Sequence, residues 1–174
     1  PALLFRMTER TMTRRFKITP YLLAASMAVS LTACGSHKQE DVELTPMQQL
    51  DKLRSQPGVT VLKDGLAYKV LKSGPKDADQ PRQGDSMMLI YEGRLPDGSI
   101  FDSSEQHGDG AYMQMPLDGL VKGWMEALPM MHVGDTWMLY VPPELGYGHK
   151  AMGVIPSNSP LIFRVQLLGV THNR

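Results

Sequence analysis

Cysteine is almost absent from this chain of 174 residues, and so is any excess of one charge. Cys34 is the single cysteine, which excludes an intramolecular disulfide framework and a cysteine-based metal cluster. The 18 basic residues are balanced by 18 acidic ones, so no overall field would attract nucleic acid or an anionic membrane. The 5 histidines are scattered and none belongs to an HExxH pair, so we expect no metal site and no cofactor.

Long hydrophobic runs are also missing. The apolar stretch at residues 21–31 is shorter than the about twenty residues that span a bilayer, and it follows a basic segment, as in a secretory signal. LTAC at residues 31–34 resembles the lipobox of bacterial lipoproteins, in which the cysteine is lipidated. We therefore predict a leader and lipoprotein signal peptide at residues 1–33, with Cys34 as the lipidation site. The alternatives are an ordinary secretory signal and a buried helix with a chance cysteine.

This reading places the protein on the periplasmic side of a bacterial cell envelope, held to the membrane by a lipid anchor. Gly35 follows the cysteine, and the absence of Asp there favours the outer membrane. A secreted form is the alternative. Residues 34–58 are predicted to be a lipidated N-terminus and tether with about two helical turns, because Leu50 and Leu53 share a helical face before Pro57 and Gly58 end it.

Residues 59–174 alternate short strands and turns, and we expect them to form one folded domain. The expected strands are residues 66–71, 86–95, 136–141 and 161–170. A short helix is expected to start at Asp118 and Gly119, with Leu120, Trp124 and Leu128 on one face. The pattern predicts an α+β domain in which an antiparallel β-sheet is wrapped around one short α-helix.

The stretch YEGRLPDGSIFDSS, residues 91–104, is the most informative part of this domain. Its tyrosine ends a strand whose alternate side chains face a core. PDGS at residues 96–99 is typical of a turn, because proline fixes φ, aspartate bonds its own backbone and glycine accepts a positive φ. Phe101 beside Asp102, close in space to Tyr91, would make a mostly apolar pocket with one oriented acceptor. On these residues alone, a hairpin with a core phenylalanine and a turn-capping aspartate remains open.

Five motifs in order resemble the FKBP-type peptidyl-prolyl cis/trans isomerases: YEGRLPDGSIFDSS, LVKGWMEAL (120–128), VPPELGYG (141–148), GVIP (153–156) and LIFRVQLL (161–168). The resemblance covers residues 65–170 and is greatest to bacterial exported members such as the macrophage infectivity potentiator group. It implies an FKBP-like fold and a prolyl isomerase. Relatives with long N-terminal helices dimerise through them, so the short tether here favours a monomer.

The resemblance also implies the site. Trp124 would form the floor under the proline ring, and the Val121 N–H would donate to a substrate carbonyl. The residues assigned to the catalytic pocket are Tyr91, Phe101, Asp102, Val121, Trp124, Tyr147, Ile155 and Phe163, with Leu120 and Val154 as substrate-binding neighbours. The implied partners are X-Pro segments of unfolded or exported proteins and the macrolide inhibitors of the family.

Rotation about an X-Pro bond requires no nucleophile or metal, and a dry apolar pocket favours the twisted amide, which is less dipolar than the planar one. We therefore expect the rate of turnover to be nearly constant around pH 5 to 8, where histidines titrate.

Two alternative functions would use the same pocket. They are a proline-segment-binding chaperone and a surface virulence module with incidental isomerase activity. The loop GHKAM at residues 148–152 is one residue shorter than the corresponding loop of cytosolic members of the family, so we assign no role to His149. Met113 and Met115 stand where many relatives carry phenylalanine, and they predict a softer pocket wall because methionine adapts its shape.

Overall fold

The computed structural model describes residues 43–108 and 111–173. The predicted signal peptide at residues 1–33 and the lipidation site Cys34 lie outside these ranges. In the described residues, no helix has the length and apolar character needed to cross a membrane.

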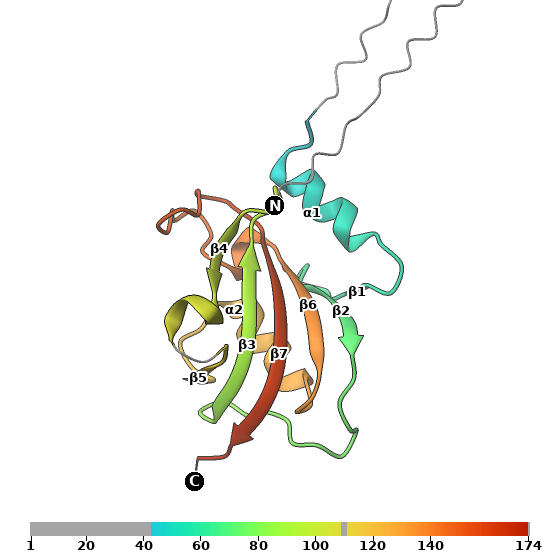
Figure 1. Ribbon diagram of the computed structural model, residues 1–174. Coiled ribbons are helices and arrows are strands. Elements are labelled where there is room, and N and C mark those ends of the chain that lie inside the picture. The colour runs from blue at the N-terminus through green and yellow to red at the C-terminus, as the bar shows by residue number, and fades with distance from the viewer. Residues whose placement is uncertain (1–42, 109–110, 174) are drawn as a thin grey trace, which may run out of the picture. The chain divides into compact units, whose positions relative to one another are not determined.

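Seven strands form one antiparallel sheet in the order β1-β2-β6-β7-β3-β4, and β5 pairs with β3 beyond the end of β4 (Figure 1). The strands are β1 Thr60–Val61, β2 Ala67–Lys72, β3 Ser86–Arg94, β4 Ile100–Ser103, β5 Met113–Pro116, β6 Thr136–Val141 and β7 Leu161–Thr171. The predicted antiparallel α+β fold is therefore confirmed. β1, β4 and β5 are not among the four expected strands, because each has only two to four residues and pairs with the edge of a longer strand.

The helices are short. They are α1 Pro46–Arg54, α2 Lys122–Ala127 and three 3₁₀ turns, η1 Ser104–His107, η2 Leu128–Met130 and η3 Pro143–Leu145. The prediction that the central helix starts at Asp118 and Gly119 was wrong by several residues. Gly119 has a φ of 65°, which is left-handed and cannot continue an α-helix, so α2 begins only after Val121. Leu120 consequently precedes the helix.

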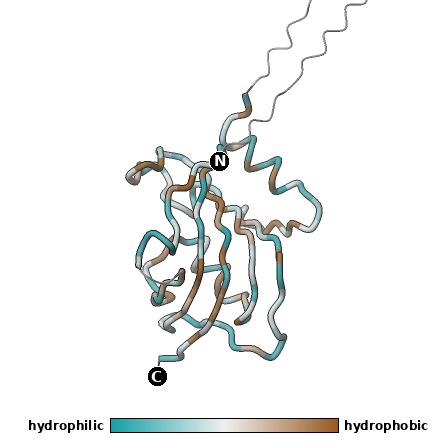
Figure 2. Tube along the Cα trace, viewed as in Figure 1, coloured by the Kyte–Doolittle hydropathy of each residue, from teal (hydrophilic) through white to brown (hydrophobic). Residues whose placement is uncertain are grey.

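The two faces of the sheet bury different side chains. Along β6, Leu139 and Val141 join the main core on the face where α2 packs, whereas Tyr140 belongs to a second, smaller cluster. This alternation follows from the period of two in a strand, and apolar positions recur along the central strands in Figure 2. The main core is therefore the environment from which the pocket is built.

Helix α1 packs on the opposite face of the sheet from α2. Its Leu50 is fully buried in the second cluster, against Ala67, Tyr140 and Ile162. Arg54 Nη1 donates a 2.8 Å hydrogen bond to the Gly65 carbonyl. Thr45 and Gln48 form a capping box that starts the helix. The helical turns predicted within the tether are thus present, and they are docked on the domain.

Candidate active site

Four aromatic rings from four elements pack edge to face on the helix side of the sheet. The Tyr91 ring of β3 lies 5.3 Å from that of Trp124 on α2, at 85°. Trp124 lies 5.1 Å from Phe163 of β7 at 74°, and Phe163 lies 5.5 Å from Phe101 of β4 at 87°. Edge-to-face pairs at these separations are the geometry that aromatic rings prefer. The rings therefore support one another as a fixed wall.

These rings line a cavity of about 220 Å³. Its lining residues are Tyr91, Phe101, Asp102, Met115, Gly119, Leu120, Val121, Trp124, Tyr147 and Phe163. Eight of the ten residues singled out from the sequence are thus brought together around one hollow. Met115 from β5 and Gly119 complete the lining. A cavity of this size, mostly apolar and with few polar groups, suits a small ring such as that of proline.

Two of the residues singled out do not line the hollow. Val154 is 73% exposed at the tip of a turn closed by the bridge between Met152 and Ile155. Ile155 points the other way and is buried in the main core. The resemblance placed both residues at the pocket, but in this turn one side chain is exposed to solvent and the other is buried in the core.

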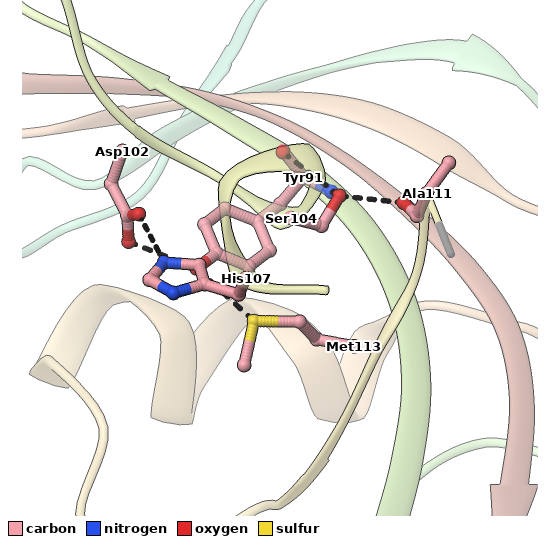
Figure 3. A network of polar contacts seen from close by, with 6 residues as sticks. All are labelled: Tyr91, Asp102, Ser104, His107, Ala111 and Met113. Carbon is pink, nitrogen blue, oxygen red and sulfur yellow. Dashed lines mark hydrogen bonds and ion pairs between the residues drawn. The ribbon is translucent and has the colours of Figure 1, made fainter. Parts of the chain in front are cut away.

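The polar side of the cavity is centred on Asp102 (Figure 3). Its Oδ2 accepts a 2.9 Å hydrogen bond from the Tyr91 hydroxyl, and Met113 Sδ lies 3.6 Å from the same hydroxyl. Burial, followed by the hydrogen bond to Asp102, raises the pKa of Tyr91 well above its usual range. Tyr91 is therefore a neutral donor at physiological pH, and its hydroxyl orients the carboxylate.

The turn between β3 and β4 brings Phe101 and Asp102 back to Tyr91. Asp97 Oδ1 accepts from the Ser99 N–H at 2.8 Å, and Gly98 adopts a φ of 88°. The register shifts between Gly93 and Arg94, and Gly93 pairs with Asp102. Since Gly93 has no side chain, the Phe101 ring can lie directly against its backbone. The hairpin thereby closes one side of the cavity.

The structure adds two residues that sequence reasoning missed. Ser104 is fully buried, and its Oγ accepts from the Tyr91 N–H at 3.2 Å and donates to the Ala111 carbonyl at 2.7 Å. His107 Nε2 lies 2.6 Å from Asp102 Oδ1. No periodicity or motif in the sequence signals that His107 contacts Asp102. Both residues belong to η1, which spans residues 104–107.

A second hollow in the described part of the chain offers different chemistry. A larger hollow of about 490 Å³ lies near residues 76–82, His132 and His172, and charged side chains of both signs line it. It lacks the wall of Phe, Tyr and Trp rings found in the smaller cavity, which is therefore the candidate active site. Within residues 43–108 and 111–173, no three His, Cys, Asp or Glu side chains are grouped to hold a metal ion.

Comparisons with known proteins agree with this geometry. A family model described as FKBP-type peptidyl-prolyl cis-trans isomerase matches residues 77–168. The chain is 46% identical over 118 residues to the peptidyl-prolyl cis-trans isomerase Mip of Coxiella burnetii, covering 67% of this chain and 50% of that protein. It is 39% identical over 118 residues to an outer membrane protein MIP of Legionella longbeachae, covering 67% of this chain and 49% of that protein.

The fold has a solved counterpart as well. A crystal structure of a peptidyl-prolyl cis-trans isomerase from Pseudomonas syringae aligns with a TM-score of 0.65 at 30% identity, covering 73% of this chain and 91% of that chain. The chain spans about half the length of the curated relatives named above. These matches confirm the resemblance that the five motifs carry.

Proposed function

Because this chain belongs to the family of FKBP-type peptidyl-prolyl cis-trans isomerases, we propose that it catalyses cis/trans isomerisation of X-Pro bonds in unfolded or exported proteins. The observation that carries the proposal is the cavity walled by Tyr91, Phe101, Trp124 and Phe163. Its aromatic wall offers a proline ring apolar contact on several sides. Asp102 is the one carboxylate in its lining.

The mechanism rests on desolvation. The planar amide is held by resonance, and rotation costs about 18–20 kcal/mol without a catalyst. In the twisted transition state the nitrogen loses conjugation, so the carbonyl is less dipolar and loses less by leaving water. A dry cavity therefore raises the free energy of the planar amide relative to the twisted one. Trp124 is only 4% exposed and would supply the floor under the ring.

Two groups at the rim would orient the substrate. The Val121 N–H precedes α2 and donates to no protein acceptor among the described residues, so it is available to a substrate carbonyl. The Tyr147 side chain lines the cavity and is 36% exposed, as a donor at the entrance would be. Holding the flanking chain while the ring is buried leaves rotation about one bond as the remaining motion.

The proposal predicts that the purified protein accelerates isomerisation of Leu-Pro or Phe-Pro peptides, and that a macrolide ligand of the family inhibits it competitively. NMR exchange between the cis and trans peptide measures this directly. Rates equal to the uncatalysed control, together with saturable peptide binding, would replace the enzyme by a proline-segment-binding module. A control variant is His149→Ala, which changes an exposed residue outside the cavity lining and should alter the rate less than twofold.

We place the protein at the cell envelope as a lipoprotein. The support is the basic segment, apolar run and LTAC at residues 14–34, together with a relative named as an outer membrane protein. Cys34→Ser should move the protein from the membrane to the soluble fraction of cells, because each buried CH₂ of an acyl chain contributes about 0.8 kcal/mol to anchoring. Its isomerase activity should remain. A variant that still sediments with membranes would contradict the anchor.

A further inference from the structure

His107 makes the cavity carboxylate part of a three-residue network. The two oxygens of Asp102 have separate partners, because Oδ2 accepts from the Tyr91 hydroxyl while Oδ1 lies 2.6 Å from His107 Nε2. Figure 3 shows the imidazole facing the carboxylate beside the Tyr91 ring. Asp102 and not His107 lines the cavity. Any influence of His107 on the substrate is therefore exerted through Asp102.

The position of His107 is set by defined contacts. It is the last residue of η1, and η1 begins at the fully buried Ser104. The Ser104 hydroxyl bonds both to the Tyr91 N–H and to the Ala111 carbonyl, which holds the turn against β3. Tyr91 of β3 also donates a hydrogen bond to Asp102. The turn that carries His107 and the carboxylate that it contacts are therefore both held by the same residue of β3.

His107 contributes the one imidazole side chain to this network. Imidazole titrates between about pH 5 and 8. The Tyr91 hydroxyl stays neutral there, because burial raises its pKa. The other titratable groups near the pair are Glu105, on η1 itself, and Tyr147, which affects Tyr91 from the cavity rim. Within the described residues, His107 is the one basic side chain that pairs with Asp102.

The charge of this pair bears on the dryness of the cavity. An ionised carboxylate on the cavity wall retains water, whereas a carboxylate paired with an imidazolium forms a neutral, charge-assisted hydrogen bond. The His107 and Asp102 side chains are 44% and 36% exposed, so water screens the pair and its effect on folding stability is small. Its effect falls on the orientation and net charge of a single cavity group.

We propose that His107 is a positioning residue that makes turnover depend on pH: the imidazolium holds and neutralises Asp102, and its deprotonation lowers kcat/KM. The inference rests on the proposed isomerase function. It revises the flat profile expected from the motifs alone, since no proton is transferred to substrate but the cavity still contains a titrating neighbour. The curve should be a single step that falls with rising pH, without a second limb.

The test measures kcat/KM for a Phe-Pro peptide from pH 5.5 to 8 by NMR exchange, which needs no coupling protease. The wild-type value should fall about two- to fivefold, the range that a screened ion pair allows. His107→Arg should be flat at the low-pH level of the wild type, because guanidinium stays charged. His107→Gln should be flat at the high-pH level, and the exposed control His149→Gln should keep the wild-type step.

A structural role alone would give the same loss in both His107 variants at every pH, which would overturn the inference. A wild-type profile without a step would also overturn it. If the wild type shows no turnover, the proposed function fails, and the inference is then decided by the Kd of the same peptide, measured from Trp124 fluorescence. That Kd should rise with pH in the wild type, be flat in both variants, and be tighter in His107→Arg than in His107→Gln.

Discussion

Phe101→Ala should lower kcat/KM by about 10- to 100-fold, the largest effect expected from any single change in the cavity wall. The ring lines the cavity, and its loss both admits water and removes the edge-to-face support of Phe163. Because Phe101 is only partly buried, the protein should stay folded. Kinetics and thermal unfolding, measured on the same sample, separate the two effects.

The relative loss of kcat/KM in three cavity variants tests the desolvation mechanism. Asp102→Asn should cost less than Phe101→Ala, about two- to fivefold, because the amide keeps an acceptor for the Tyr91 hydroxyl and loses only the ion pair that orients it towards His107. Trp124→Leu should resemble Phe101→Ala in activity but should also lower the melting temperature, since Trp124 belongs to the main core. If Asp102→Asn abolished activity while Phe101→Ala was tolerated, acid–base chemistry would replace desolvation.

Gly93→Ala should damage the cavity without removing any side chain that lines it. A Cβ at this position would lie 2.5 Å from Phe101 Cζ and 3.0 Å from Phe163 Cε1, so both rings would have to move. Overpacking of this kind costs about 1–3 kcal/mol of stability. We expect kcat/KM to fall at least tenfold, because a displacement of about 1 Å is sufficient for such losses.

Gly169→Ala is the matched control for this prediction. It also lies in a central strand, β7, but its nearest neighbour would be Met88 Cβ at 3.9 Å, an ordinary contact. Activity and melting temperature of Gly169→Ala should remain close to those of the wild type. Equal losses of activity in the two glycine variants would show that both glycines are needed for their backbone conformation. The close approach of Phe101 to Gly93 would then not be the cause of the loss in Gly93→Ala.

Much of the fold could be predicted from local pattern because strand periodicity reports burial directly. β6 was expected at residues 136–141 and occupies Thr136–Val141. Leu161, Phe163, Val165 and Leu167 alternate along β7 as expected and enter the main core. The order of the five motifs was sufficient to indicate the family. In the fold, these motifs bring side chains from β3, β4, α2 and β7 to one cavity.

The features that required the tertiary structure depend on contacts between distant segments. β5 exists because β3 offers it an edge, and α2 starts late because Gly119 is left-handed. Val154 and Ile155 are adjacent in sequence, yet a tight turn exposes one and buries the other.

The sequence by itself determined the four longer strands through their periodicity, and it indicated the family and the aromatic residues of the cavity through the resemblance of five ordered motifs. The tertiary structure alone decided the pairing of His107 with Asp102 and the docking of Leu50 against Tyr140. Neither pair shares a periodicity or a motif that could signal contact. Both depend on where a turn directs a side chain in space, which spacing along the chain does not specify.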